Sequence, residues 1–158
     1  MGISPWLVLL SVVTYGLVHS VLASQMVKDS ARRWFGPSTD RYYRLFFVGV
    51  ATVITIPLLV LPIILPDQKL YSIPMPWILI TGAIQLASAG ALLYGVSQTG
   101  AGYFLGLRQV LDPTLPPPHM VTDGLYRWVR HPLYTASILF IWLTPTMTVN
   151  LVALYFGI

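Results

Sequence analysis

The sequence contains no cysteine and no glutamate, and only 9% of its 158 residues are charged. Without cysteine there can be no disulfide, no thiolate metal ligand and no cysteine nucleophile. A soluble domain usually carries charge on about a quarter of its residues. Because so few charges cannot cover a surface in water, and because 56% of the residues are hydrophobic, the composition predicts an integral membrane protein.

Several apolar segments are long enough to cross a bilayer, which takes about 20 residues of helix. Three of them lie at about 3–23, 45–65 and 76–96. A fourth apolar stretch, 133–158, is broken near 144–147, where Pro145 removes a backbone donor. We therefore expect a C-terminal helical hairpin there, with a single kinked fourth span as the alternative. The expected fold is an all-α, polytopic helical bundle that forms one transmembrane domain over residues 1–158.

The basic residues gather in two of the connecting loops, 24–44 and 97–132, while the loop 66–75 holds one lysine and one aspartate. By the positive-inside rule the two basic loops are predicted to be cytoplasmic and the N-terminus extracytoplasmic. Since the excess positive charge of +4 is confined to loops, it indicates orientation among membrane lipids and not binding of nucleic acid. The first apolar run has no basic segment before it, so we interpret it as a retained span and not as a signal peptide.

The loop 97–132 is long and rich in aromatic residues, which favours a functional segment over a disordered one. Pro132 suits the first position of a helix, and the residue before a proline is extended. Arg130 and His131 should therefore precede a helix N-terminus, where unpaired N–H groups and the helix dipole favour an anion. Either they bind a carboxylate or phosphate of a ligand, or they are anchors at the lipid headgroups.

These residues carry a resemblance to a known family. Gly124-Leu125-Tyr126, followed by Val129-Arg130-His131-Pro132-Leu133-Tyr134, resembles the signature of membrane methyltransferases related to isoprenylcysteine carboxyl methyltransferase and phospholipid N-methyltransferases. Val18-His19-Ser20, the segment 104–109 and the segment 142–148 extend the resemblance over nearly the whole chain. They point to the NnrU and nurim-like branch, which includes methanethiol S-methyltransferases.

The resemblance implies a membrane-embedded methyltransferase that uses S-adenosyl-L-methionine and acts on a small thiol or a lipophilic acceptor. The cofactor would lie at the cytoplasmic ends of the last helices, and no metal would be needed. The residues that the resemblance assigns to the cofactor are Gln109, His119, Val121, Tyr126, Arg130, His131, Pro132 and Tyr134. His131 and Arg130 are also the candidates for a catalytic role. His19, within the first span, either makes a structural hydrogen bond or belongs to a substrate pocket.

The chain departs from the family pattern at its C-terminal end. The family continues into a cytoplasmic tail with paired glutamates and an arginine, whereas this sequence has no glutamate and ends at Ile158. Either such a tail follows in the full gene product, or the protein is a non-catalytic membrane protein of the same fold. An accessory subunit, bound to other membrane subunits, is the form we expect the second alternative to take.

Overall fold

The computed structural model describes residues 2–112 and 121–157 and is mostly helical. Its elements are α1 (Ser4–Ala23), α2 (Gln25–Phe35), α3 (Thr39–Ile64), β1 (Lys69–Ser72), α4 (Trp77–Gln98), α5 (Ala101–Phe104), α6 (Leu107–Leu111), the 3-10 helix η1 (Gly124–Arg127), α7 (Pro132–Trp142), β2 (Thr146–Thr148) and α8 (Val149–Gly157). Among the described residues, α1, α3 and α4 are long and apolar enough to cross a membrane. They indicate a membrane-embedded protein.

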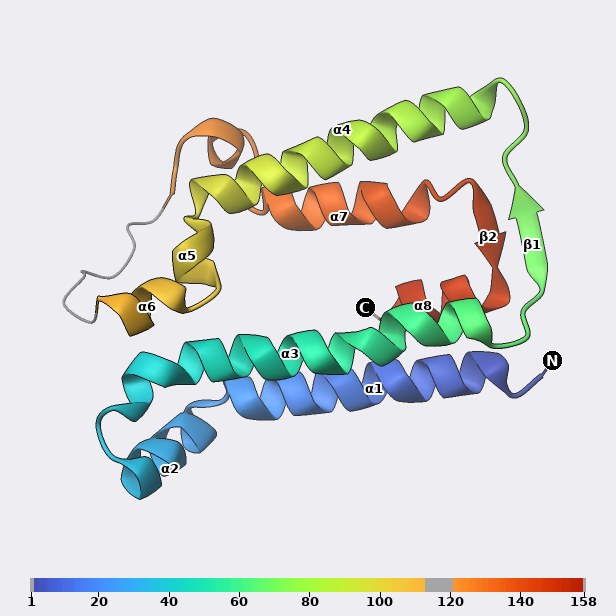
Figure 1. Cartoon of the computed structure of the whole chain (residues 1–158). Helices are drawn as coiled ribbons and strands as arrows, with labels where there is room; N and C mark the ends of the chain where they lie inside the picture. The colour runs from blue at the N-terminus through green and yellow to red at the C-terminus, as the bar shows by residue number, and fades with distance from the viewer. Residues whose placement is uncertain (1, 113–120, 158) are drawn as a thin grey trace.

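The long helices are arranged as two antiparallel pairs, α1 with α3 and α4 with α7 (Figure 1). The short helices α2, α5 and α6, together with η1, lie at one end of both pairs. We call this end, which carries most of the arginines, the basic end. At the opposite end, β1 and β2 connect the two pairs, and we call it the ribbon end.

The pair α4 and α7 packs closely because small residues of α4 face α7. A Cβ on Gly95 would lie 2.7 Å from the Cδ2 atom of Leu133. Since α7 ends at Trp142, the carbonyl of Phe140 has no partner within its own helix. The side chain of Gln85 donates to that carbonyl across 2.8 Å, and so satisfies a backbone group that lipid cannot.

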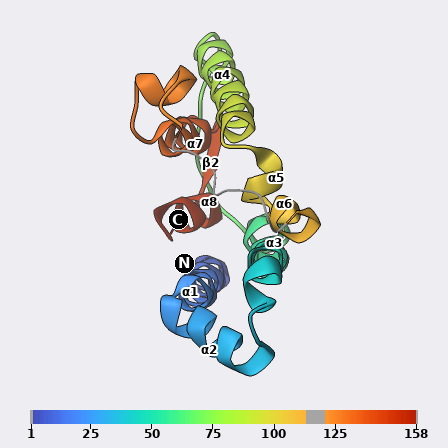
Figure 2. The same ribbon diagram turned by 90° about the vertical axis from the view of Figure 1, so that its left-hand side faces the viewer.

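The C-terminal helix α8 returns from the ribbon end and packs against α1 and α3 (Figure 2). Its residues Ala153 and Leu154 form a buried cluster with Val8, Val12 and Leu58. Both views place α8 between the two helix pairs. The first turn of α8 is capped by Asp67, whose Oδ1 accepts the backbone N–H of Asn150 at 3.0 Å.

The ribbon of β1 and β2 was not expected from an all-α reading of the sequence. The strands pair antiparallel, with Tyr71 opposite Met147 and Ser72 opposite Thr146. Met147 is only 1% exposed. The pairing satisfies backbone groups that the break at Pro145 leaves without helical partners, and it explains why the chain turns back there.

The predicted ranges 3–23 and 76–96 lie within two residues of α1 and α4, whereas α3 begins at Thr39, six residues before the predicted range 45–65. As expected for a hairpin, the C-terminal stretch forms two helices, α7 and α8, joined by β2, and not one kinked helix. The two segments that were predicted to be loops contain helices. The segment 24–44 contains α2 and the first turns of α3, whereas 97–132 contains α5, α6 and η1. Short helices form in both segments because each is punctuated by a glycine at positive φ and is packed against a long helix.

Candidate functional site

A cavity with a volume of about 650 Å³ lies at the basic end. We call it the basic-end cavity. Its walls come from α3, the end of α4, α5, α6, η1 and the residues just before α7. The lining residues are Arg44, Thr99, Tyr103, Phe104, Gln109, Val121, Thr122, Tyr126, Arg130 and His131.

One wall of this cavity is held in place by two arginines of α3. Arg44 donates from Nε to the carbonyl of Phe104 at 3.1 Å, and Arg41 donates from Nε to the carbonyl of Val110 at 2.8 Å. These carbonyls lie at the ends of the short helices α5 and α6, where helical partners are missing. The two arginines therefore tie α5 and α6 to α3.

Gly106 allows the same wall to approach α3. Its φ is +81°, and a Cβ at this position would lie 2.7 Å from the backbone nitrogen of Leu45. Only glycine adopts such a conformation without strain and leaves room for a neighbouring backbone. The turn between α5 and α6 is thus fixed by close contact with the main chain of α3.

The opposite wall is fixed by Gln98, the last residue of α4. Its Nε2 donates to the carbonyl of Asp123 at 3.3 Å, and its Oε1 accepts the N–H of Leu125 at 3.4 Å. Gly124, between these two residues, has a φ of +60°, and a Cβ there would lie 1.9 Å from Gln98 Nε2. The glutamine side chain thus occupies the space that any larger residue at position 124 would need, and η1 is held on the end of α4.

Arg130 and His131 lie where the proline rule predicts, directly before α7. His131 is the N-cap residue of α7, and its carbonyl accepts the N–H of Thr135 at 3.1 Å. Both side chains line the basic-end cavity and are exposed. No ion pair with a described carboxylate engages Arg130, so its guanidinium can bind an anionic ligand.

Gln109 supplies an acceptor that has no partner among the described residues. Its Nε2 donates to the carbonyl of Tyr103 at 3.2 Å, whereas its Oε1 is buried without a hydrogen bond. A buried acceptor without a donor is costly. Since Gln109 lines the cavity, a ligand that donates a hydrogen bond would remove this cost.

The cavity brings together five of the residues that the family resemblance assigned to the cofactor: Gln109, Val121, Tyr126, Arg130 and His131. Pro132 is buried at the start of α7 and faces a different groove, between α4 and α7. Tyr134 is 72% exposed and does not line the cavity, although its ring lies 5.8 Å from that of His131. His119 lies outside the described residues.

His19 does not line the basic-end cavity either. Its ring lies between those of Tyr15 and Phe47, at centroid distances of 5.5 Å and 4.9 Å. Its Nδ1 is buried and has no partner among the described residues. These ring contacts are typical of a side chain packed between α1 and α3, and not of one that lines a substrate pocket.

Sequence reasoning did not assign Arg44, Tyr103 and Phe104 to the site. Arg44 was counted only among the basic residues of the loop 24–44, and Tyr103 only among the aromatic residues of the loop 97–132. Their role depends on the packing of α5 against α3, which no local pattern predicts. The cavity lining among the described residues contains two arginines, three aromatic rings and no carboxylate, and this arrangement suits a ligand with a planar group and a negative charge.

No protein-family model, curated protein or solved structure matches this chain.

Proposed function

We propose that the chain is a membrane methyltransferase of the NnrU and nurim-like type, and that the basic-end cavity binds S-adenosyl-L-methionine. The observation that carries this proposal is the convergence of Gln109, Tyr126 and His131, from three separate segments, on one cavity. The cavity volume of about 650 Å³ falls within the range of sites for small molecules and cofactors.

The residues present fit the chemical groups of this cofactor. Arg130 offers a guanidinium group to its carboxylate, and the rings of Tyr103, Phe104 and Tyr126 offer faces to its adenine. The buried Oε1 of Gln109 is an acceptor for an amino group. When bound, the cofactor supplies an electrophilic methyl group on a sulfonium sulfur.

The chain itself would orient the reactants. It would hold a thiolate, or a carboxylate on a lipophilic acceptor, in line with the methyl group, and this proximity would speed the attack. For a neutral thiol, the imidazole of His131 would accept the proton as the sulfur attacks.

We also propose that the basic end faces the cytoplasm and that α1, α3 and α4 each cross the bilayer. The charge distribution supports this orientation, because the described residues carry Lys28, Arg32, Arg33, Arg41, Arg44, Arg108, Arg127 and Arg130 at the basic end and only Lys69 at the ribbon end.

A non-catalytic membrane protein of the same fold, such as an accessory subunit, is the second candidate. The two candidates differ in one measurable property, which is binding of the cofactor.

Calorimetric titration of the purified chain with S-adenosyl-L-methionine tests the proposal. We expect saturable binding that the double variant Arg130→Ala, His131→Ala weakens by at least tenfold, because a charge-assisted contact contributes about 1.5–3 kcal/mol. Arg127→Ala is the matched control, since Arg127 is exposed in η1 and does not line the cavity. If the unsubstituted chain does not bind, or if the control loses as much affinity as the double variant, the proposal is wrong.

A further inference from the structure

A second, smaller cavity of about 220 Å³ lies beside the basic-end cavity. We call it the Lys28 cavity. Its lining residues are Ala23, Lys28, Tyr43, Arg44, Phe47, Val48 and Phe104. Arg44 and Phe104 line both cavities, and the hydrogen bond between them forms part of the wall that separates the two.

The Lys28 cavity lies at the boundary between apolar and basic surface. Ala23 is the last residue of the apolar helix α1, and Lys28 is in the first part of α2. On α3, Phe47 and Val48 lie three and four residues after Arg44, the last basic residue of that helix. In a chain whose α1 and α3 cross a bilayer, this is the depth of the phosphate and glycerol groups of the lipids.

Lys28 and Arg44 are the two cations of this cavity, and no carboxylate is among its described lining residues. The ammonium group of Lys28 makes no hydrogen bond or ion pair with the described residues. Arg44 uses Nε to hold the carbonyl of Phe104, which leaves its terminal N–H groups available.

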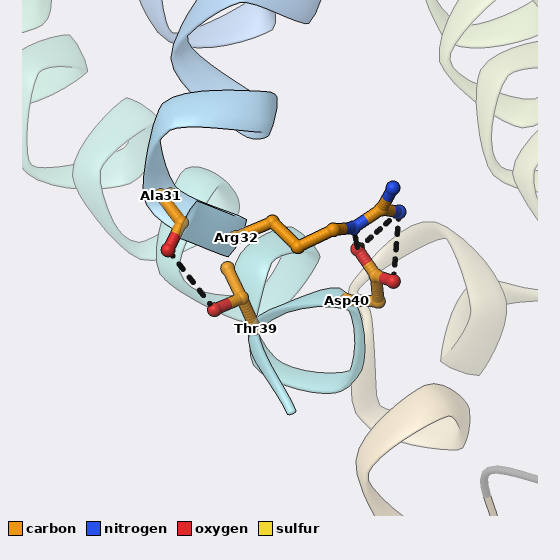
Figure 3. A network of polar contacts seen from close by, with 4 residues as sticks. All are labelled: Ala31, Arg32, Thr39 and Asp40. Carbon is orange, nitrogen blue, oxygen red and sulfur yellow. Dashed lines mark hydrogen bonds and ion pairs between the residues drawn. The ribbon is translucent and has the colours of Figure 1, made fainter. Parts of the chain in front are cut away.

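The nearby carboxylates neutralise this pair only in part. Asp40 lines an adjoining hollow but is taken by Arg32, whose Nη2 lies 2.7 Å and 2.8 Å from its two oxygens (Figure 3). This hydrogen bond, with the charge of Asp40, raises the pKa of Arg32 above its ordinary value. Lys28 and Arg44 also line this hollow, together with the exposed Asp29. Since Asp40 is paired with Arg32, Asp29 is the one remaining carboxylate of its described lining against these two cations, which leaves a net positive charge.

The remaining walls are apolar. Three apolar residues lie on the side of the two cations that is nearer the middle of α1 and α3, namely Ala23, Phe47 and Val48. A soluble anion such as inorganic phosphate gains nothing from such walls, because it has no apolar surface to bury. A lipid does, since its glycerol and first acyl carbons follow directly after the phosphate.

We propose that Lys28 and Arg44 bind the phosphate of an anionic phospholipid, with its glycerol and the start of its acyl chains against Phe47 and Val48. The lipid is a bound ligand and not the methyl acceptor. This proposal does not depend on methyl transfer. Arg44 and Phe104 would lie between the bound lipid and the candidate cofactor site.

The experiment is a titration of the delipidated full chain, in neutral detergent, with phosphatidylglycerol and separately with phosphatidylcholine, read by native mass spectrometry. We expect one molecule of phosphatidylglycerol to bind, at least about fivefold more tightly than phosphatidylcholine. A fivefold increase in affinity is about what one basic side chain contributes to binding of an anionic lipid. Equal affinity for the two lipids would overturn the proposal.

Variants distinguish a specific lipid site from general electrostatic attraction between the basic end and anionic lipids. Lys28→Gln should lower the affinity for phosphatidylglycerol by about fivefold, and Lys28→Arg, which keeps the charge, should stay within about twofold. Arg33→Gln is the matched control, because it removes one charge from an exposed position of the same helix that lines neither hollow. An equal loss in Lys28→Gln and Arg33→Gln would overturn the proposal, and so would no loss in either.

The source of the phosphate is tested by competition. Millimolar inorganic phosphate should not displace bound phosphatidylglycerol, because the apolar walls contribute only to lipid binding. Displacement by inorganic phosphate would show a site for soluble anions and would contradict the assignment to a lipid. The melting temperature of Lys28→Gln, measured without lipid, should equal that of the unsubstituted chain. Its lower affinity for lipid then results from the lost contact and not from unfolding.

Discussion

At the scale of single residues, Gly124 and Gly106 fix the two walls of the basic-end cavity by letting the backbone come close to a neighbour. Each adopts a positive φ, and a side chain at either position would overlap with Gln98 or with the backbone of α3. A residue other than glycine at such a φ costs about 1–2 kcal/mol from its own conformation. The positions of Tyr126 and Gln109 in the cavity therefore depend on residues that contact no ligand.

Gly124→Ala is expected to weaken binding of S-adenosyl-L-methionine by about tenfold, which corresponds to about 1.4 kcal/mol, because Gln98 must give up its hydrogen bonds to Asp123 and Leu125 or η1 must move. The measurement is the dissociation constant by calorimetry. Gly90→Ala is the control, since a Cβ at Gly90 meets no atom within 4 Å and alanine is a better helix former. A Gly124→Ala variant that binds as tightly as Gly90→Ala would show that this wall does not position the site.

At the scale of elements, the long helices could be predicted and the short ones could not. An apolar run of about 20 residues determines α1, α3 and α4 almost alone, because lipid requires every backbone group to be satisfied within the segment. The strand β1 covers only Lys69–Ser72, all of them exposed, and it exists because β2 pairs with it. No local pattern in four residues predicts a partner so distant in the sequence.

Some residues of the candidate site could likewise be predicted from the sequence, and others could not. Arg130 and His131 could be placed before α7 because a proline at the first helical turn is a local signal. The contributions of Arg44 and Phe104 could not be predicted, since they arise from the packing of α5 on α3 and from one hydrogen bond between distant segments. The family resemblance included the segment 104–109 but assigned only Gln109 to the cofactor.

At the scale of the whole molecule, the orientation of the chain in a membrane would decide from which side the proposed cofactor and lipid reach the basic end. Ser38 and Ser72 are exposed; Ser38 directly precedes α3, and Ser72 lies in β1, beyond the other end of α3, and the chain has no cysteine that would interfere with labelling. In intact cells that express the variants, a membrane-impermeant maleimide should label Ser72→Cys, whereas Ser38→Cys should react only after permeabilisation. The reverse pattern would invert the topology, and labelling of both variants in intact cells would mean that α3 does not cross.

The central claim is that separate segments of this chain form one site for S-adenosyl-L-methionine. The most direct measurement is ultraviolet cross-linking of radiolabelled cofactor to the chain in lipid nanodiscs, with the modified peptides identified by mass spectrometry. We predict label within 99–109 or 121–131, which contain nearly all of the cavity lining, and its suppression by excess S-adenosylhomocysteine. Label at the ribbon end, within 66–75, or label that S-adenosylhomocysteine does not suppress, would contradict the account.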